Sequence, residues 1–457
     1  MRSICAARLL SLLPLALLLP ACQGDDAASQ STEGTGGATG AGDPAKPDRT
    51  GGTNAPAVER DIVSTGLVLD LTARRGRAEI RLARGSAPTR FEIGDLRIEA
   101  VSTTDGEPLD FETPEAGVLE VKAPASATTL VIDYLFSKHG RFDGWDATPG
   151  FTFLWPYFCS NLFPCHSGPA DGTKFTLEVA GVPAGKTAIY PEAIPAAAPS
   201  YQIGLTVGDY TYERLGDTAA GTEIGVYYAP GGRDAALAGA AQLPGYFGFF
   251  EETLGQYLFG PKAASVSVDW GPGDFGGLEH HPLWHIDDGQ MGDANTHAHE
   301  AAHGWFGGGV RIACWEDFVL SEGTVTYLAA RAIEAVEGAT AGEAQWALYH
   351  EDLKGMVAGG EDTAAWLPDT CNEIRIADHP IWSLVIYYKG AFFLRAVEAE
   401  VGREALDRVL GAFYRKHGGA KAARMQDLLD AIEAETGFDT ADLSATWLLG
   451  TGLPKGF

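Results

Sequence analysis

Five consecutive residues in the second half of the chain, His299-Glu300-Ala301-Ala302-His303, constrain its fold most. On a helix, residues four positions apart share a face, so both imidazoles can converge on one metal ion. Eighteen residues separate His303 from Glu322, enough for a turn and a second helix that returns this carboxylate as third ligand. Two imidazoles, one carboxylate and an open fourth position form a catalytic zinc site. The motif also occurs by chance on amphipathic helices, so alone it leaves both interpretations open.

Other motifs lie in the order found in one peptidase family. They are Gly276-Gly277-Leu278-Glu279 upstream, Ser321-Glu322-Gly323 around the third ligand, Tyr387-Tyr388-Lys389-Gly390 downstream, and the outlying Phe163-Pro164-Cys165, Pro199-Ser200-Tyr201 and Gly452-Leu453-Pro454. From about residue 60 onward the chain therefore resembles the gluzincin aminopeptidases, the thermolysin-like family that includes alanyl and leucyl aminopeptidases. We expect the catalytic domain to be the last, without the helical C-terminal domain that many relatives carry.

The resemblance implies a zinc aminopeptidase that removes N-terminal residues from peptides, with one zinc per chain on His299, His303 and Glu322. It assigns Glu300 as general base for a zinc-activated water and Tyr387 as hydrogen-bond donor to the oxyanion. Tyr388 is the alternative donor if the alignment slips by one residue.

The resemblance also implies how a substrate binds. The strand of Gly276 and Gly277 lines the cleft, and the Glu279 carboxylate holds the free α-ammonium of the peptide. A surface glutamate on a sheet edge is the alternative for Glu279. Phe153 and Trp155 stand where the family has Gln and Glu, which makes this part of the substrate pocket apolar and aromatic and leaves the substrate class open.

The groups that orient the metal ligands depart from the family pattern. Many relatives have a carboxylate seven residues after the third ligand, where this chain has Ala329, and we expect Asp317 to substitute for it. The remaining histidines of this region are interpreted as polar surface or structural residues and not as ligands; they are His280, His281, His285 and His297.

Two alternatives to the aminopeptidase remain. One is an endopeptidase or another zinc hydrolase of the same fold, and the other is a non-catalytic binding protein of the cell envelope. A formal net charge of −28 argues against nucleic acid as a partner. The sequence does not specify an oligomeric state.

The N-terminus has the pattern of an exported bacterial lipoprotein. Residues 1–21 read as a lipoprotein signal peptide that ends before Cys22, the expected site of lipidation, with ordinary signal cleavage as the alternative. Residues 22–57 are mostly small and polar and predict a disordered tether. We therefore expect a lipid-anchored protein of the cell envelope, on the periplasmic or surface face.

Two further domains follow the tether. Short β-branched and aromatic runs broken by Gly, Pro and Asp predict an all-β, saddle-like sandwich domain over 58–207. Helical spacing then predicts a thermolysin-like α+β zinc-peptidase domain over 208–457, with the site in the cleft between the two. The clearest expected strands are 62–71, 78–82, 91–100 and 130–135, and the clearest expected helices are 391–410 and 425–435.

Four cysteines remain in these two domains, and four cysteines allow three pairings. Proximity in the sequence and in the domain favours Cys159 with Cys165 and Cys314 with Cys371. Buried free thiols are the alternative.

Overall fold

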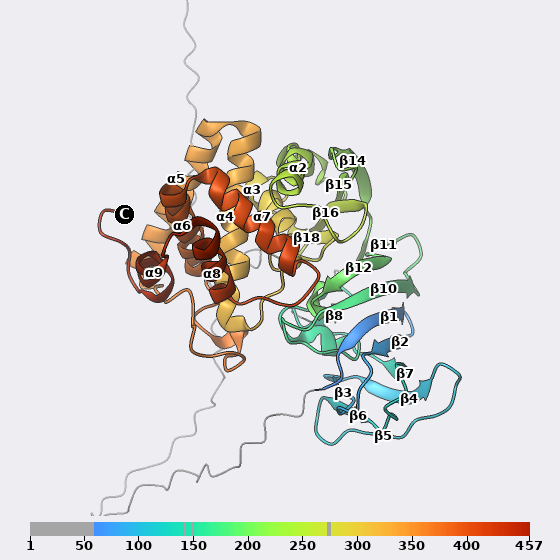
Figure 1. The fold of residues 1–457 in the computed structure, drawn as a ribbon. Coiled ribbons are helices and arrows are strands. Elements are labelled where there is room, and N and C mark those ends of the chain that lie inside the picture. The colour runs from blue at the N-terminus through green and yellow to red at the C-terminus, as the bar shows by residue number, and fades with distance from the viewer. Residues whose placement is uncertain (1–58, 141, 149, 272–275) are drawn as a thin grey trace, which may run out of the picture. The chain divides into compact units, whose positions relative to one another are not determined.

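The computed structural model describes residues 59–140, 142–148, 150–271 and 276–457 (Figure 1). The described residues 59–270 and 276–457 belong to one compact unit. The predicted signal peptide, the predicted tether and Cys22 lie outside the described residues. No helix in the described part of the chain is both long and apolar enough to cross a membrane.

The first part of the described chain is rich in strands. Its largest sheet has the order β12-β10-β1-β2-β7-β4, in which β1 and β10 are parallel and the other neighbours are antiparallel. Every second side chain of β2 is buried, as expected for a strand with one face on the core. The strands are β1 Ile62–Asp70, β2 Arg75–Leu82, β4 Arg97–Thr103, β7 Thr129–Leu135, β10 Thr173–Ala180 and β12 Ala193–Ala198.

Two smaller sheets complete this part, with the orders β3-β6-β5 and β11-β13-β9-β8. The single strand expected over 91–100 is wrong, because a turn at Gly94, with φ +44°, divides it into β3 and β4. The strands are β3 Arg90–Glu92, β5 Phe111–Glu112, β6 Val118–Val121, β8 Gly144–Asp146, β9 Phe151–Phe153, β11 Thr187–Ile189 and β13 Thr206–Gly208, and the 3-10 helices are η1 Phe158–Asn161 and η2 Ser200–Gln202.

A five-stranded sheet of order β14-β15-β16-β18-β17 follows. Its inner strands β15, β16 and β18 are parallel, and the edge strands β14 and β17 are antiparallel to their neighbours. The strands are β14 Thr211–Asp217, β15 Glu223–Tyr228, β16 Lys262–Val268, β17 Gly277–Leu278 and β18 Leu283–Asp287. The edge strand β17 carries Gly277, and Gly276 and Glu279, which are also expected to bind a substrate, flank it.

Helices make up most of the remaining chain (Figure 1). Helix α4 is buried on all sides from Phe318 to Ile333 and contacts α2, α3, α5 and α6, so it forms the centre of this part. The one helix expected over 391–410 is wrong, because Gly402, with φ +85°, separates α6 from α7. The helices are α1 Arg233–Gly239, α2 Leu243–Thr253, α3 Ala294–Ala302, η3 Trp315–Asp317, α4 Phe318–Glu337, α5 Ala339–Ala358, η4 Ile376–Asp378, α6 Leu384–Val401, α7 Arg403–His417, α8 Met425–Thr436, α9 Ala441–Ser444 and η5 Ala445–Leu449.

The order of a strand-rich part followed by a helical part confirms the predicted fold class. The domain boundary after residue 207 stays a prediction.

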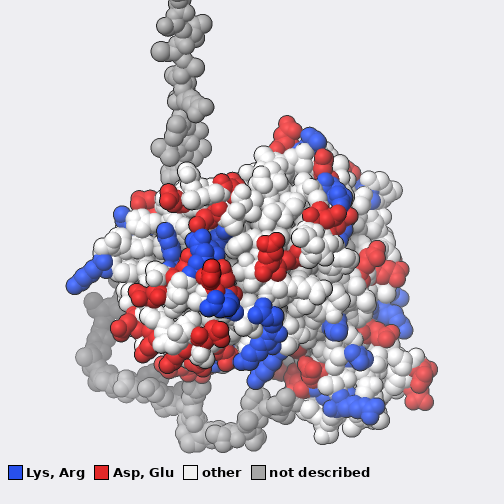
Figure 2. Space-filling view, turned by 45° about the horizontal axis from the view of Figure 1, so that its top comes forward, with Lys and Arg blue, Asp and Glu red and all other residues white. Residues whose placement is uncertain are grey.

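Both predicted disulfides are present, Cys159 with Cys165 and Cys314 with Cys371. By loop entropy they stabilise the fold by about 2 and about 4 kcal/mol. On the face shown in Figure 2, Lys and Arg side chains lie among Asp and Glu side chains, which offsets part of the negative charge locally.

Candidate metal centre and active site

Helix α3 places the two imidazoles of the metal motif side by side. It begins at Ala294, and the carboxylate of the preceding Asp293 accepts a hydrogen bond from the backbone N–H of Thr296 (2.9 Å) and caps the helix. His299 lies within α3, and His303 follows its last residue with a backbone that is still helical (φ −59°, ψ −20°). The two rings therefore lie on one side of the helix, with their centroids 5.0 Å apart.

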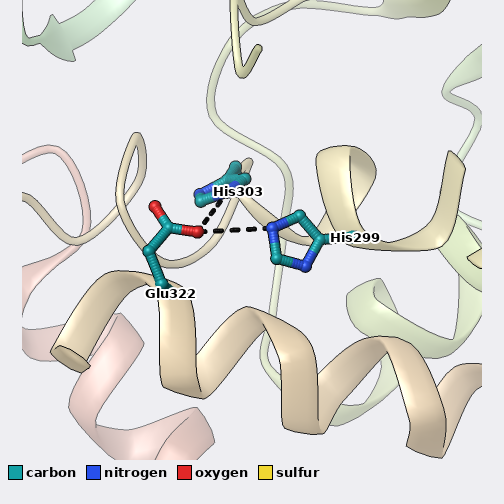
Figure 3. Close-up of side chains that lie close together, drawn as sticks. All are labelled: His299, His303 and Glu322. Atoms are coloured by element: carbon teal, nitrogen blue, oxygen red, sulfur yellow. Dashed lines mark ion pairs between the residues drawn. The ribbon is translucent and has the colours of Figure 1, made fainter. Parts of the chain in front are cut away.

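Glu322, in the second turn of α4, completes a three-residue cluster (Figure 3). Its Oε2 lies 3.3 Å from Nε2 of His299 and 3.4 Å from Nε2 of His303. One donor atom from each of the three side chains lies within 4.8 Å of the others. Two imidazole nitrogens and one carboxylate oxygen are the donor set of catalytic zinc sites, so these residues fit a zinc ion.

The second nitrogen of each imidazole faces an oxygen outside the cluster. Nδ1 of His303 lies 3.0 Å from the carbonyl oxygen of Phe306, and Nδ1 of His299 lies 3.5 Å from Oγ1 of Thr326. A proton on Nδ1 leaves the Nε2 lone pair free for a metal. The sequence analysis missed both oxygens. Thr326 stands four residues after Glu322 on α4, which was the available signal, whereas no side-chain pattern marks a carbonyl.

The expectation that Asp317 orients a ligand imidazole is wrong. Its carboxylate accepts hydrogen bonds from Trp366 Nε1 (2.9 Å) and Met425 N (3.1 Å) and pairs with Arg424. Asp317 is the last residue of the 3-10 helix η3, before α4 begins, and its carboxylate faces Trp366 and Arg424 instead of the imidazoles. Ala329 is buried and offers no polar side chain in its place.

Burial and neighbouring charges together decide the ionisation of the cluster. Burial opposes a charge on His303, but the carboxylates of Glu322, Glu279 and Glu300 outweigh it and raise the pKa of His303 to about 10. Burial alone would raise the pKa of Glu322, yet its imidazole neighbours, His303 first, lower it to about 2. Without metal the two form an ion pair, and a metal must displace the proton of His303 to bind.

Protein purified without chelator is expected to hold close to one zinc per chain by elemental analysis. His303→Ala removes a metal ligand. Loss of a group that only hydrogen-bonds to a ligand weakens metal binding by roughly 10- to 100-fold, and loss of the ligand itself should weaken zinc binding by more. His350→Ala is the control, because His350 lies outside the cluster, beside Glu351. Equal zinc in all three proteins would reject the assignment.

Glu300 points into the same region from α3. It is 5% exposed, and its Oε2 has no hydrogen-bond partner among the described residues. Burial raises the pKa of Glu300 well above its ordinary value, and the carboxylates of Glu279 and Glu322 add to this while His303 opposes it. A nearby cation would lower this raised pKa and so favour the ionised form of Glu300.

The backbone of β17 touches the Glu300 side chain. A Cβ atom at position 277 would lie 2.6 Å from Cγ of Glu300 and closer still to its carboxylate, so a side chain at this position would have to displace the Glu300 carboxylate. At Gly276 a Cβ would meet nothing within 4 Å. A side chain at position 277 would therefore disturb Glu300, whereas one at position 276 would extend into open space.

Gly277→Ala is expected to lower kcat at least about 10-fold, because the added methyl must displace the Glu300 carboxylate, and displacement of about 1 Å can cost on the order of 10²-fold. Gly276→Ala adds the same methyl group to open space and should keep kcat within about twofold of wild type. The measurement is kcat with a fixed substrate, with circular dichroism to check folding. Equal effects of the two substitutions would contradict the steric argument.

Glu279 also belongs to this region and is not a surface residue. It is 6% exposed, and one of its oxygens lies within 4.8 Å of a donor atom of both Glu300 and His303. Burial raises the pKa of Glu279, whereas His303 and a hydrogen bond from Tyr201 oppose this rise. Tyr201 is a further residue that the sequence did not place at the site, after Phe306 and Thr326.

The structure separates the two candidate tyrosines of α6. The ring of Tyr387 stacks on that of His299 (centroids 5.7 Å apart, planes at 14°). Burial raises its pKa well above the ordinary value, and nearby carboxylates, Glu322 first, raise it further, so the phenol keeps its proton at neutral pH. Tyr388 instead donates to Asp352 (3.1 Å) on α5. Tyr387 is thus the tyrosine beside the cluster.

Phe153 and Trp155 are both buried but lie in different surroundings. Trp155 packs on Phe318, whose ring in turn contacts Tyr387 (6.0 Å), so one aromatic side chain separates Trp155 from the site. Phe153 contacts the rings of Phe142 and Trp270. Their role in a substrate pocket stays a prediction.

The four other histidines are structural, and the surface alternative for them is wrong: His280, His281, His285 and His297 are each at most 1% exposed. His281 bridges Tyr257 OH and the carbonyl oxygen of Glu300, both at 2.8 Å, and so supports α3. Burial lowers the pKa of His281 to about 3, so it stays neutral.

Comparison with known proteins gives a family match and distant relatives. Residues 287–447 match the model of the peptidase family M1 domain. Aminopeptidase M1-C from Oryza sativa subsp. japonica is 25% identical over 424 residues, a match that covers 81% of this chain and 47% of that protein. Aminopeptidase N from Streptomyces lividans is 29% identical over 161 residues, covering 35% of this chain and 19% of that protein. The chain spans about half the length of the curated relatives that match most of it.

Solved structures share the fold. An M1 zinc metallopeptidase mutant from Deinococcus radiodurans, bound to a Tyr-Ser-Ala substrate, is similar with a TM-score of 0.73 and 20% identity, over 86% of this chain and 95% of that chain. Native yeast LTA4 hydrolase is similar with a TM-score of 0.71 and 21% identity, over 87% of this chain and 69% of that chain. At these identities the likeness establishes the fold alone.

Proposed function

Because the chain belongs to the gluzincin aminopeptidase family, with a peptidase family M1 domain over residues 287–447, we propose that it is a zinc-dependent aminopeptidase that removes N-terminal residues from peptides. The observation that carries this proposal is the convergence of His299, His303 and Glu322 beside two further buried carboxylates, Glu279 and Glu300. One zinc per chain is expected in this family.

The reaction divides among the residues of the cluster. When bound by His299, His303 and Glu322, zinc supplies Lewis-acid chemistry, acidifying a water and polarising a peptide carbonyl. Glu300, whose Oε2 has no hydrogen-bond partner among the described residues, is the base that takes the proton of the attacking water and passes it to the leaving amine. The protonated phenol of Tyr387 donates to the oxygen on which negative charge develops.

Glu279 provides the preference for a free N-terminus. Burial raises the pKa of Glu279, and a cation placed beside the carboxylate stabilises its ionised form. The α-ammonium of a peptide is such a cation. An acetylated N-terminus carries no charge and gains nothing from Glu279. The proposal therefore predicts exopeptidase action.

The test compares chromogenic aminoacyl amides with their N-acetylated counterparts. Wild type is expected to cleave only the free amides, and Glu279→Gln should lose activity on them while keeping its zinc. Equal cleavage of free and acetylated substrates would favour the alternative, an endopeptidase or another zinc hydrolase of this fold. The apolar Phe153 and Trp155, where the family has polar groups, motivate that alternative. No cleavage of any substrate by zinc-loaded protein would favour the non-catalytic binding protein.

We also propose that the protein is exported and lipid-anchored through Cys22 in the cell envelope. The support is the apolar stretch from Leu9 to Leu19, followed by Pro20-Ala21-Cys22. Cys22→Ser should abolish labelling by a fatty-acid analogue and move the protein to the soluble fraction. Membrane association that survives this substitution would reject the lipid anchor.

A further inference from the structure

The connection between α5 and α6, residues 359–383, is called the α5–α6 segment here. Its regular structure is limited to the short helix η4, and between Leu367 and Arg375 no residue is buried. Burial of apolar side chains therefore contributes little to holding this stretch in place. Its position depends on specific contacts, which include hydrogen bonds from the Arg424 guanidinium to the carbonyl oxygens of Pro368 and Thr370.

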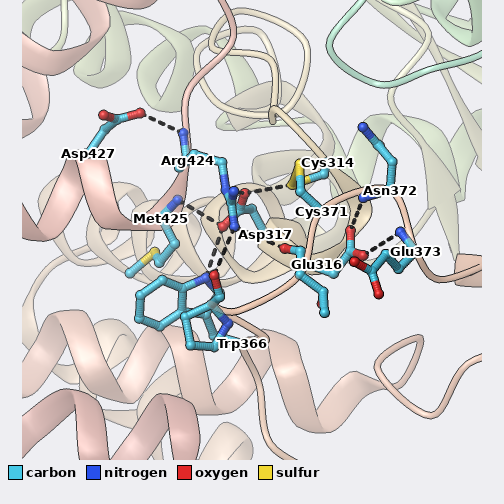
Figure 4. Close-up of a disulfide and its surroundings, with 12 residues drawn as sticks. Cys314, Glu316, Asp317, Trp366, Cys371, Asn372, Glu373, Arg424, Met425 and Asp427 are labelled. Carbon is cyan, nitrogen blue, oxygen red and sulfur yellow. Dashed lines mark hydrogen bonds and ion pairs between the residues drawn. A yellow bond between two sulfur atoms is a disulfide. The ribbon is translucent and has the colours of Figure 1, made fainter. Parts of the chain in front are cut away.

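The first tether joins the segment to the residues just before α4 (Figure 4). Exposed Cys371 is bonded to Cys314, which is fully buried. Next to this disulfide, the buried carboxylate of Glu316 accepts hydrogen bonds from the backbone N–H groups of Asn372 (2.9 Å) and Glu373 (2.8 Å). The disulfide and Glu316 thus hold one point of the segment on the start of the helix that carries Glu322.

The other end of the segment lies against residues of the strand-rich part. The Tyr157 phenol accepts a hydrogen bond from the N–H of Ile376, and the Arg375 guanidinium lies 5.1 Å above the Tyr157 ring. Trp382 packs on Trp155 with the ring centroids 5.1 Å apart. Trp155 is buried, whereas Trp382 is partly buried and lies near the end of the segment. The next residue, Ser383, caps α6, which carries Tyr387.

We propose that the Cys314–Cys371 disulfide and the Glu316 carboxylate are a positioning device that fixes the α5–α6 segment and thereby keeps Trp382 packed on Trp155. The inference rests on the proposed function in one respect, namely the substrate-binding role that the sequence predicts for Trp155. It adds that Trp382, packed on Trp155, bounds the space for the first side chain of a substrate. Without the tethers the exposed stretch loosens as far as buried Ile376, the contact of Trp382 with Trp155 is held less firmly, and large apolar first residues lose part of their contact surface. Small first residues, which do not reach that surface, are unaffected.

The experiment compares Cys314→Ser/Cys371→Ser with the matched control Cys159→Ser/Cys165→Ser, which removes the other disulfide. Hydrogen exchange of the amides of residues 370–383 reports on the tether without activity. KM and kcat for alanine and phenylalanine chromogenic amides report on specificity, and elemental analysis reports on zinc. As a second perturbation, reductant added to the folded control variant breaks the Cys314–Cys371 bond without a mutation at either cysteine.

The expected result is at least about 10-fold faster exchange over 370–383 in the Cys314→Ser/Cys371→Ser variant and in the reduced control variant, but not in the untreated control. KM for the phenylalanine amide should rise about fivefold or more, while kcat and KM for the alanine amide and the zinc content stay within twofold. Glu316→Gln should shift both readouts in the same direction by less, since an amide retains one acceptor oxygen.

Unchanged exchange in the Cys314→Ser/Cys371→Ser variant overturns the positioning role, and so do equal KM changes for both amides or equal effects of the two disulfides. If wild type cleaves neither amide, the proposed function and the specificity role both fail. Accelerated exchange in that case shows that the failure lies in the proposed function and not in the tether.

Discussion

Glu300→Gln is expected to retain zinc while kcat falls by about 10²- to 10⁴-fold, the usual contribution of a positioned general base. Glutamine has nearly the same shape as glutamate and fits against Gly277, but it cannot take a proton from water. His299, His303 and Glu322 are unchanged, so the metal site stays complete. The measurements are kcat for an aminoacyl amide and the zinc content of the same sample.

Folding should not suffer from this substitution. Burial raises the folded-state pKa of Glu300, so its ionised form destabilises the metal-free fold once the pH exceeds the unfolded-state pKa. A neutral amide lacks this penalty, and the metal-free variant should unfold at a temperature no lower than that of wild type. Glu343→Gln, on the exposed face of α5, is the control and should leave kcat unchanged. A Glu300→Gln protein with normal kcat and full zinc would remove Glu300 from the reaction.

The metal cluster could be predicted because it depends on local geometry. A spacing of four residues on a helix determines that His299 and His303 share a side, wherever the helix lies in the fold. The prediction of Glu322 required one more assumption, namely that a second helix brings this residue back to the two imidazoles. The eighteen residues between His303 and Glu322 are enough for the turn and the start of that helix. The two disulfides followed from proximity along the chain. Interactions between residues close in sequence are therefore the predictable part of this site.

The errors concern contacts that only tertiary packing decides. Asp317 was expected beside an imidazole, but its position at the start of α4 turns it toward Trp366 and Arg424. The histidines near the site were partly attributed to the surface, because nothing in their own sequence reveals Tyr257 as the buried partner of His281. The breaks at Gly94 and Gly402 were missed, because a single glycine inside an apolar run does not by itself end a strand or a helix.

The choice between the adjacent tyrosines required the structure for the same reason. Neighbouring residues on a helix differ by about 100°, so only one of the two can face the cluster, and the helix as a whole determines which. Helix α6 presents Tyr387 to His299 and Tyr388 to Asp352. A motif match gave the same answer, and the contacts supply its physical basis.

Tyr387→Phe is accordingly expected to lower kcat by about 10²- to 10³-fold, the scale measured for loss of one oxyanion donor. Phenylalanine preserves the ring that stacks on His299, so zinc content and KM should change little, and the loss should appear in kcat. Tyr388→Phe is the matched control: it removes the same hydroxyl one residue away, where the partner is Asp352, and should keep kcat within about twofold. The measurement is kcat for one aminoacyl amide with all three proteins at saturating zinc.

A normal kcat in Tyr387→Phe together with a large loss in Tyr388→Phe would transfer the donor role to Tyr388. A loss in neither variant would mean that the histidine and glutamate residues act without a phenol donor.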